Sequence, residues 1–122
     1  MKKICVVVAS RANYGRVKYL LKAIERHPQL ELQLIVGAST LLQRFGPAID
    51  VIRNDGFKPL RSIFYVVEGE TLATQAKSTG LGIVELSTAF DDLAPDVVVT
   101  VADRFETMAT AIAATYLNIT LA

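Results

Sequence analysis

Short, continuous apolar runs constrain this chain more than any other feature. Runs of about four to eight apolar residues rich in β-branched types are typical of strands buried on both faces. Three runs are clear, a fourth is weaker and a fifth begins where the sequence stops: Ile4 to Ala9, Leu30 to Val36, Val97 to Ala102, Ile63 to Val67, and Ile119 to Ala122. Since 52% of the 122 residues are hydrophobic, one domain with one core is expected.

Between these runs the apolar spacing changes to that of amphipathic helices. Two stripes are expected to face inward: Val17, Leu20, Leu21 and Ile24, and then Phe105, Met108, Ala109, Ile112, Ala113 and Tyr116. A third helix is expected from Thr71 to Leu93, with its inward residues Leu72, Ala76, Ile83, Leu86 and Phe90. Gly80 and Gly82 weaken its first half. Phe45 to Asp55 is predicted to hold a shorter helix after Gly46-Pro47, ended by Gly56.

Strand and helix therefore alternate about four times, with a fifth strand begun. This order predicts an α/β fold with a Rossmann-like, doubly wound parallel sheet, right-handed crossovers and helices on both faces. Ligands of such folds bind at the carboxyl ends of the strands. The rule selects two connections, Ser10 to Gly15 and Ala102 to Glu106.

The charges nearly cancel, with 13 basic and 12 acidic side chains, so no broad field favours nucleic acid or an anionic membrane. No run of about 18 apolar residues occurs, as a membrane-spanning helix would need. The single cysteine, Cys5, cannot form an intramolecular disulfide, which suits a reducing compartment. We expect a soluble, cytoplasmic protein.

In the first connection, Arg11 lies beside a predicted helix amino terminus. The free N–H groups there, together with the guanidinium, can hold a phosphate. The sequence contains neither a dinucleotide fingerprint nor a P-loop. The alternative is a solvated loop arginine, and this motif alone does not decide between the two.

In the second connection, Asp103 stands where an aspartate would cap the following helix and also face the ligand crevice. Capping and acid/base chemistry are both open, and they are compatible. Arg104 supplies a second cation near the same edge, and Glu106 is favoured in the first helical turn by the helix dipole. His27, alone before Pro28, is expected at a helix terminus rather than in a metal site.

Three segments, in this order, resemble the hydrolysing UDP-N-acetylglucosamine 2-epimerases of sialic-acid and nonulosonic-acid pathways. Ser10-Arg11-Ala12-Asn13-Tyr14-Gly15 is similar to the family's S/T-R-A-D/E-Y-G, and Asp55-Gly56-Phe57 recurs in its place. Asp103-Arg104-Phe105-Glu106 resembles the family's G-D-R-F/Y-E. The resemblance spans nearly the whole chain.

The resemblance implies a two-domain fold of the glycosyltransferase B type, with a UDP-sugar in the cleft between the domains and no metal ligand or redox cofactor. Residues 1–122 would form a partial amino-terminal domain, without the rest of that domain or the second one. Arg11, Gly15 and Arg104 would lie at the UDP, and Asp103 would do acid/base work at the sugar. The family eliminates UDP to a glycal and adds water, giving N-acetylmannosamine. We expect the whole protein to form homo-oligomers and this chain alone to be inactive.

The sequence departs from the family pattern at three places. Ala9 and Ala102 stand where the family has glycine, and each added methyl is expected to crowd backbone near the ligand. Asn13 replaces the usual acid. Two alternatives therefore stay open: a non-catalytic nucleotide-sugar-binding α/β module, and another UDP-sugar enzyme such as a glycosyltransferase.

Overall fold

A computed structural model describes residues 1–37, 48–63, 71–101 and 105–122. Its elements follow the predicted alternation of strand and helix: β1 (Lys2–Val8), α1 (Arg11–Arg26), β2 (Leu30–Gly37), α2 (Ala48–Asn54), β3 (Arg61–Ile63), α3 (Leu72–Leu93), β4 (Val97–Val99), α4 (Phe105–Tyr116) and β5 (Thr120–Leu121). Among the residues described, no helix has the length and apolar character that crossing a membrane would require.

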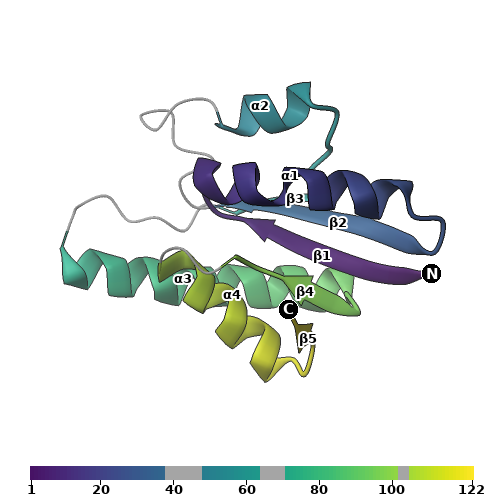
Figure 1. Cartoon of the computed structure of the whole chain (residues 1–122). Coiled ribbons are helices and arrows are strands. Elements are labelled where there is room, and N and C mark those ends of the chain that lie inside the picture. Colours follow the sequence, from purple (N-terminus) through teal and green to yellow (C-terminus); the bar gives the residue numbers. More distant parts are fainter. Residues whose placement is uncertain (38–47, 64–70, 102–104) are drawn as a thin grey trace.

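The five strands form one parallel sheet in the order β3-β2-β1-β4-β5. Strand β1 pairs along its whole length with β2, from Lys2 opposite Leu30 onward, and on its other edge it pairs with β4. Helices α1 and α2 cover one face of the sheet, and α3 and α4 cover the other (Figure 1). The predicted α/β fold with helices on both faces is confirmed.

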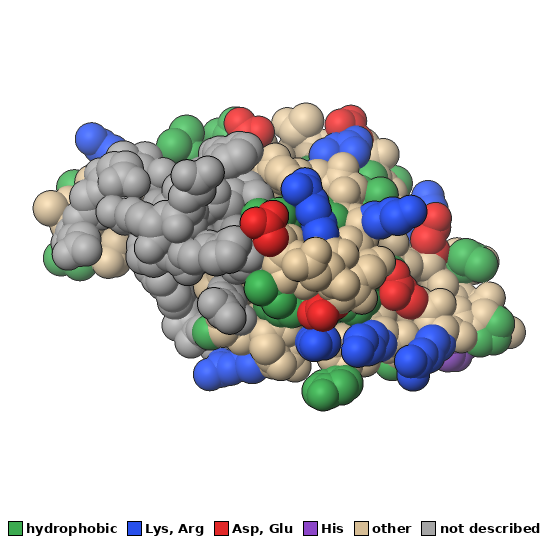
Figure 2. All heavy atoms as spheres, turned by 90° about the horizontal axis from the view of Figure 1, so that it is seen from above, with side chains coloured by type: hydrophobic (Ala, Val, Ile, Leu, Met, Phe, Trp, Pro, Cys, Tyr) green, Lys and Arg blue, Asp and Glu red, His purple; other side chains and the backbone are tan. Residues whose placement is uncertain are grey.

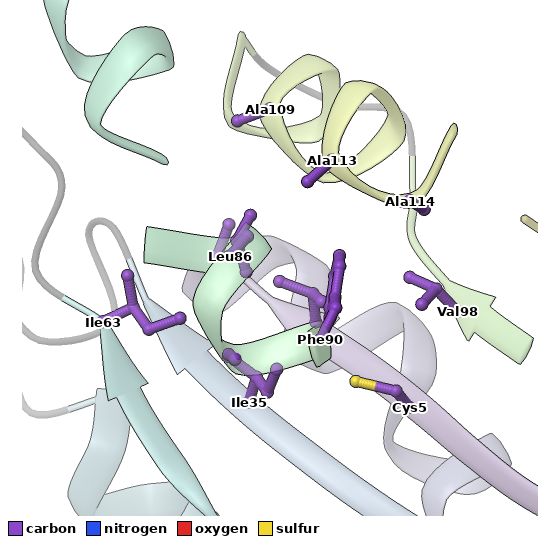
Figure 3. Close-up of a cluster of buried hydrophobic side chains, with 12 residues drawn as sticks. Cys5, Ile35, Ile63, Leu86, Phe90, Val98, Ala109, Ala113 and Ala114 are labelled. Atoms are coloured by element: carbon purple, nitrogen blue, oxygen red, sulfur yellow. The ribbon is translucent and has the colours of Figure 1, made fainter. Parts of the chain in front are cut away.

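The core is divided by the sheet into two clusters. Because successive strand residues face opposite sides, β1 sends Val6 and Val8 toward α1 and α2, and Cys5 and Val7 toward α3 and α4. The α1 side is closed by buried residues that include Tyr14, Val17, Leu21, Ile24 and Phe57. On the other side, Leu86 and Phe90 of α3 lie between the sheet and the alanines of α4 (Figure 3).

Helix α4 is rotated from the predicted orientation. Small residues face inward, and those that are buried are Ala109, Thr110, Ala113 and Ala114. Met108 and Tyr116 were expected inward, but they are 60% and 83% exposed. Alanine side chains let α4 approach α3 and the sheet closely, so the large side chains are left outside.

The inward face of α3 was predicted correctly in its second half and wrongly in its first. Leu86 and Phe90 are buried, whereas Leu72 is 83% exposed and Ala76 is also exposed. The physical reason is length, because the 22 residues of α3 extend about 33 Å and the seven residues of β1 only about 23 Å. The first turns of α3 therefore project beyond the sheet (Figure 1).

Two further boundaries and one side chain differ from expectation. Strand β3 begins at Arg61, two residues before the predicted Ile63, and β4 ends at Val99. In α1, Leu20 is 42% exposed, while the other three residues of its stripe are buried. The predicted end of α2 is confirmed: Gly56 follows the helix with φ +96°, a conformation that side chains strongly disfavour.

Two glycine-to-alanine substitutions should therefore act in opposite directions. Gly56→Ala forces a Cβ into the left-handed region and should lower the free energy of unfolding by about 1–2 kcal/mol. Gly80→Ala places a methyl on an exposed turn of α3, with open space around it, and should raise that free energy by about 0.5–1 kcal/mol. Urea denaturation measures both, and a stabilising Gly56→Ala would contradict the turn geometry.

Candidate functional site

The order of the strands reverses at β1. From β1 the chain adds β2 and β3 on one side, and then β4 and β5 on the other. Val6 of β1 is opposite Val99 of β4, so the carboxyl ends of these two parallel strands are neighbours. Helix α1 leaves β1 toward one face and α4 follows β4 on the opposite face, and a crevice at such a reversal is where ligands bind. The topology thus brings the two predicted connections to one edge.

The first connection is shorter than predicted. Ser10 caps α1, with extended φ −155° and ψ 166°, and its Oγ accepts a hydrogen bond from the Asn13 N–H at 3.1 Å. Helix α1 therefore begins at Arg11, and Ser10 to Gly15 is a helix start rather than a loop. Gly15 lies in the second turn, exposed, with nothing within 4 Å of the place a Cβ would take. The cap outweighs the poor helix propensity of glycine there.

Asn13 ties the start of α1 back to the end of β1. Its Oδ1 accepts a hydrogen bond from the Ala9 N–H at 3.2 Å, and both residues are buried. A carboxylate oxygen in the same place would accept the same bond, so the neutral amide can replace the family's usual acid in this role. Ala9 belongs to the core cluster under α3 and α4, which places its methyl group in the core.

The second connection has a comparable tie. Thr107, the third residue of α4, donates its hydroxyl to the carbonyl oxygen of Val101 at 2.6 Å. Asp103 and Arg104 lie outside the described residues, as does Ala102, and the side chain of Glu106 does too. Capping and acid/base chemistry at Asp103 therefore both stay predictions.

Arg11 is the first residue of α1, and its backbone lies at the carboxyl edge of the sheet. Helix geometry leaves the N–H groups of Arg11 and Ala12 without a partner inside the helix, which favours an anion there. The Arg11 side chain lies outside the described residues. A phosphate contact by its guanidinium stays a prediction.

A side-chain cluster behind this helix start was missed by the sequence analysis. The Tyr14 hydroxyl donates a hydrogen bond to the Asp55 carboxylate, and Lys18 Nζ lies 3.2 Å from the same carboxylate oxygen. The Tyr14 ring packs edge-on against Phe57, with ring centroids 6.3 Å apart and planes at 80°. Two of the segments that carry the family resemblance are thus in direct contact, although nothing in their spacing indicates the pairing.

The electrostatics of the cluster keep it hydrogen-bonded at neutral pH. Burial raises the pKa of Tyr14 above its ordinary value, and the hydrogen bond to Asp55 raises it further, so the hydroxyl stays a proton donor. The hydrogen bonds from Tyr14 and Lys18 lower the pKa of Asp55, so this carboxyl stays ionised.

Over the face seen in Figure 2, basic and acidic side chains are interspersed in the described part, unlike the continuous positive surface of a nucleic-acid-binding protein.

Comparison with known proteins identifies related sequences. A family profile described as UDP-N-acetylglucosamine 2-epimerase matches residues 22–122. A UDP-N-acetylglucosamine 2-epimerase of Neisseria meningitidis serogroup B is 31% identical over 109 residues, covering 89% of this chain and 28% of that protein. A GDP/UDP-N,N'-diacetylbacillosamine 2-epimerase (hydrolyzing) of Campylobacter jejuni is 33% identical over 110 residues, covering 90% and 28%. The polysialic acid biosynthesis protein P7 of Escherichia coli is 30% identical over 121 residues, covering 99% and 31%.

Solved structures show the same fold. A crystal structure of UDP-N-acetylglucosamine 2-epimerase superposes with a TM-score of 0.84 at 23% identity, covering 98% of this chain and 32% of that one. A structure of S. aureus MnaA with UDP superposes with a TM-score of 0.82 at 25% identity, covering 99% and 30%. The chain therefore spans less than a third of the length of these relatives.

The lowered pKa of Asp55 predicts a pH-dependent contribution to stability. The ionised carboxylate stabilises the fold above the ordinary pKa of 3.8, and this contribution is lost as pH falls through the lower folded-state value. Asp55→Asn removes this contribution to stability at all pH values. Urea unfolding of both proteins should show a stability difference that is constant between about pH 5 and 7 and shrinks below about pH 4. A difference that grows on acidification would contradict the assignment.

Proposed function

The chain belongs to the UDP-N-acetylglucosamine 2-epimerase family, and we propose that it forms part of a hydrolysing UDP-N-acetylglucosamine 2-epimerase. The observation that supports this proposal is the reversal of strand order, where the carboxyl end of β1, followed by α1 at Arg11, lies beside the carboxyl end of β4, which precedes Asp103 and Arg104 in the sequence. The chain spans less than a third of its relatives, and we propose that it supplies one wall of the site. We propose that residues 1–122 alone are inactive.

The nucleotide is proposed to bind by its diphosphate at the start of α1. The free N–H groups of the first helical turn and the guanidinium of Arg11 are donors suited to phosphate oxygens. Arg104 would add a second cation from the neighbouring connection. The exposed position of Gly15, with open space around it, supports a close approach of the ligand along this side of α1.

Asp103 is proposed to act as an acid or base at the sugar. In the elimination, a base takes the proton from C2, the C1–O bond to UDP breaks, and the electron pair left at C2 forms the C1=C2 double bond of the glycal. Water then adds at C1, and a proton returns to C2 on the opposite face to give N-acetylmannosamine. A positioned carboxyl group is suited to such proton transfers.

The names of two relatives bear on the substrate and the pathway. A related diacetylated amino sugar is the second candidate substrate, because one relative is named for N,N'-diacetylbacillosamine. The polysialic acid relative supports a role in sialic-acid synthesis.

The buried free thiol of Cys5 is compatible with a reducing, cytoplasmic location. We also propose that the whole protein forms a homo-oligomer. The alternatives to an epimerase are a non-catalytic nucleotide-sugar-binding module and another UDP-sugar enzyme such as a glycosyltransferase.

Removing the Arg11 guanidinium should weaken UDP binding by the full-length protein. Loss of a charge-assisted contact corresponds to about 1.5–3 kcal/mol, or roughly ten- to 150-fold in affinity, for Arg11→Ala. Arg11→Lys keeps the charge without the planar fork and should fall between this variant and the wild type. Titration calorimetry with UDP is the measurement. An alanine variant that binds within about twofold of the wild type would mean a solvated arginine.

Asp103→Asn should separate catalysis from binding in the full-length enzyme. Asparagine keeps the shape and the capping oxygen but cannot ionise, so turnover should fall by roughly 10²-fold or more with UDP affinity nearly unchanged. Conversion of UDP-N-acetylglucosamine to N-acetylmannosamine is the assay. Near-normal turnover with an unchanged melting temperature would remove Asp103 from the reaction and favour a capping role.

A further inference from the structure

We propose that Tyr14 and Asp55 are positioning residues for the nucleotide site. Through their hydrogen bond they hold the amino terminus of α1, and with it Arg11, in the place where a diphosphate binds. The inference rests on the proposed function and deepens it, because both residues act through the position of Arg11 and the first turn of α1.

Tyr14 connects directly to the anion-binding end of α1. It is the fourth helical residue, three positions after Arg11, and its N–H donates to the carbonyl oxygen of the capping Ser10 at 3.1 Å. Its side chain is only 5% exposed. The Tyr14 side chain is therefore packed directly beside the first turn of α1, which begins at the carboxyl edge of the sheet.

The backbone around Asp55, on the other side of this contact, is held by hydrogen bonds at the end of α2. Its own N–H donates to the Val51 carbonyl at the end of α2, and the Gly56 N–H donates to the Arg53 carbonyl, each at 3.0 Å. Phe57, next along the chain, is 2% exposed and packs against the Tyr14 ring. The carboxylate thus stands on a tight turn that is anchored in the core.

The Asp55 carboxylate contacts two successive turns of α1. Its Oδ2 accepts from Tyr14 and pairs with Lys18, which lie one helical turn apart on the same side of α1. Both contacts meet at one oxygen, so Asp55 ties this side of the helix start to the turn after α2. The middle of α1 is held independently by Val17 and Leu21 in the core, so loss of the hydroxyl bond affects mainly the first turn.

UDP titration of full-length variants tests the inference. Tyr14→Phe keeps the ring and removes the hydroxyl, and Asp55→Ala removes the acceptor. Each should weaken UDP binding by roughly fivefold, and the double variant should bind no more weakly than the weaker single one, because both remove the same bond. Arg11→Ala is titrated in parallel as the measure of the proposed function itself.

Two matched controls separate positioning from general stability. Tyr19→Phe makes the same substitution on the same helix at a residue that is 77% exposed. Asp96→Asn weakens a different carboxylate hydrogen bond, the one that Asp96 accepts from the Lys3 backbone N–H at 2.7 Å, where β1 and β4 begin and far from the carboxyl edge. Both controls should bind UDP like the wild type, even where Asp96→Asn lowers the melting temperature as much as Tyr14→Phe does.

Each outcome bears on the inference. If Tyr14→Phe and Asp55→Ala bind within about twofold of the wild type while Arg11→Ala loses affinity, the positioning role is wrong and the nucleotide site stands. Losses that multiply in the double variant also overturn it, since the two residues would then act separately. A wild type that does not bind UDP overturns the proposed function and the inference with it. If Tyr14→Phe does not fold, Asp55→Ala decides alone.

Discussion

Strand β1 is buried on both faces and hydrogen-bonded on both edges, and the positions of the other elements follow from this. A strand in that situation needs helices above and below the sheet and a neighbour on each side. The chain meets these demands by adding β2 on one edge and, much later, β4 on the other. The change of direction that this requires is the point at which ligands bind in folds of this kind, and the candidate site lies there.

The starts of α1 and α4 are tied to the segments that precede them in a similar way. In each, the third residue of the following helix bonds back to the backbone at the end of the preceding strand. Asn13 accepts from Ala9, and Thr107 donates to Val101. Both helix starts are therefore fixed to the sheet by side chains, independently of any ligand. Such preorganisation suits the proposed diphosphate site, because a charged ligand could then bind without rearrangement.

The sequence predicted the order of elements and the helices on both faces of the sheet, because these depend on local apolar periodicity and on the rules for parallel sheets. The first connection is a helix start rather than a loop, and a ligand site at the carboxyl edge stays a prediction. The sequence did not predict the exposure of Leu72 or Met108, which depends on helix length and on how closely alanine lets two helices pack. The first connection was predicted to extend to Gly15, but the cap at Ser10 starts α1 at Arg11, so Gly15 lies inside the helix. The bond between Tyr14 and Asp55 joins residues 41 positions apart, and no local pattern encodes it.

The pairing of β1 with β4 also has a consequence for how the domain folds. The Lys3 N–H and the Asp96 carboxylate that it contacts are 93 positions apart in the chain, far more than the neighbouring segments that form β1, α1 and β2. Closing so long a loop costs more chain entropy than forming the local unit, and topology of this kind slows folding. The carboxyl ends of β1 and β4 become neighbours only when that distant pairing forms. A ligand that touches both connections binds only the closed sheet, and it thereby stabilises the β1–β4 pairing by mass action.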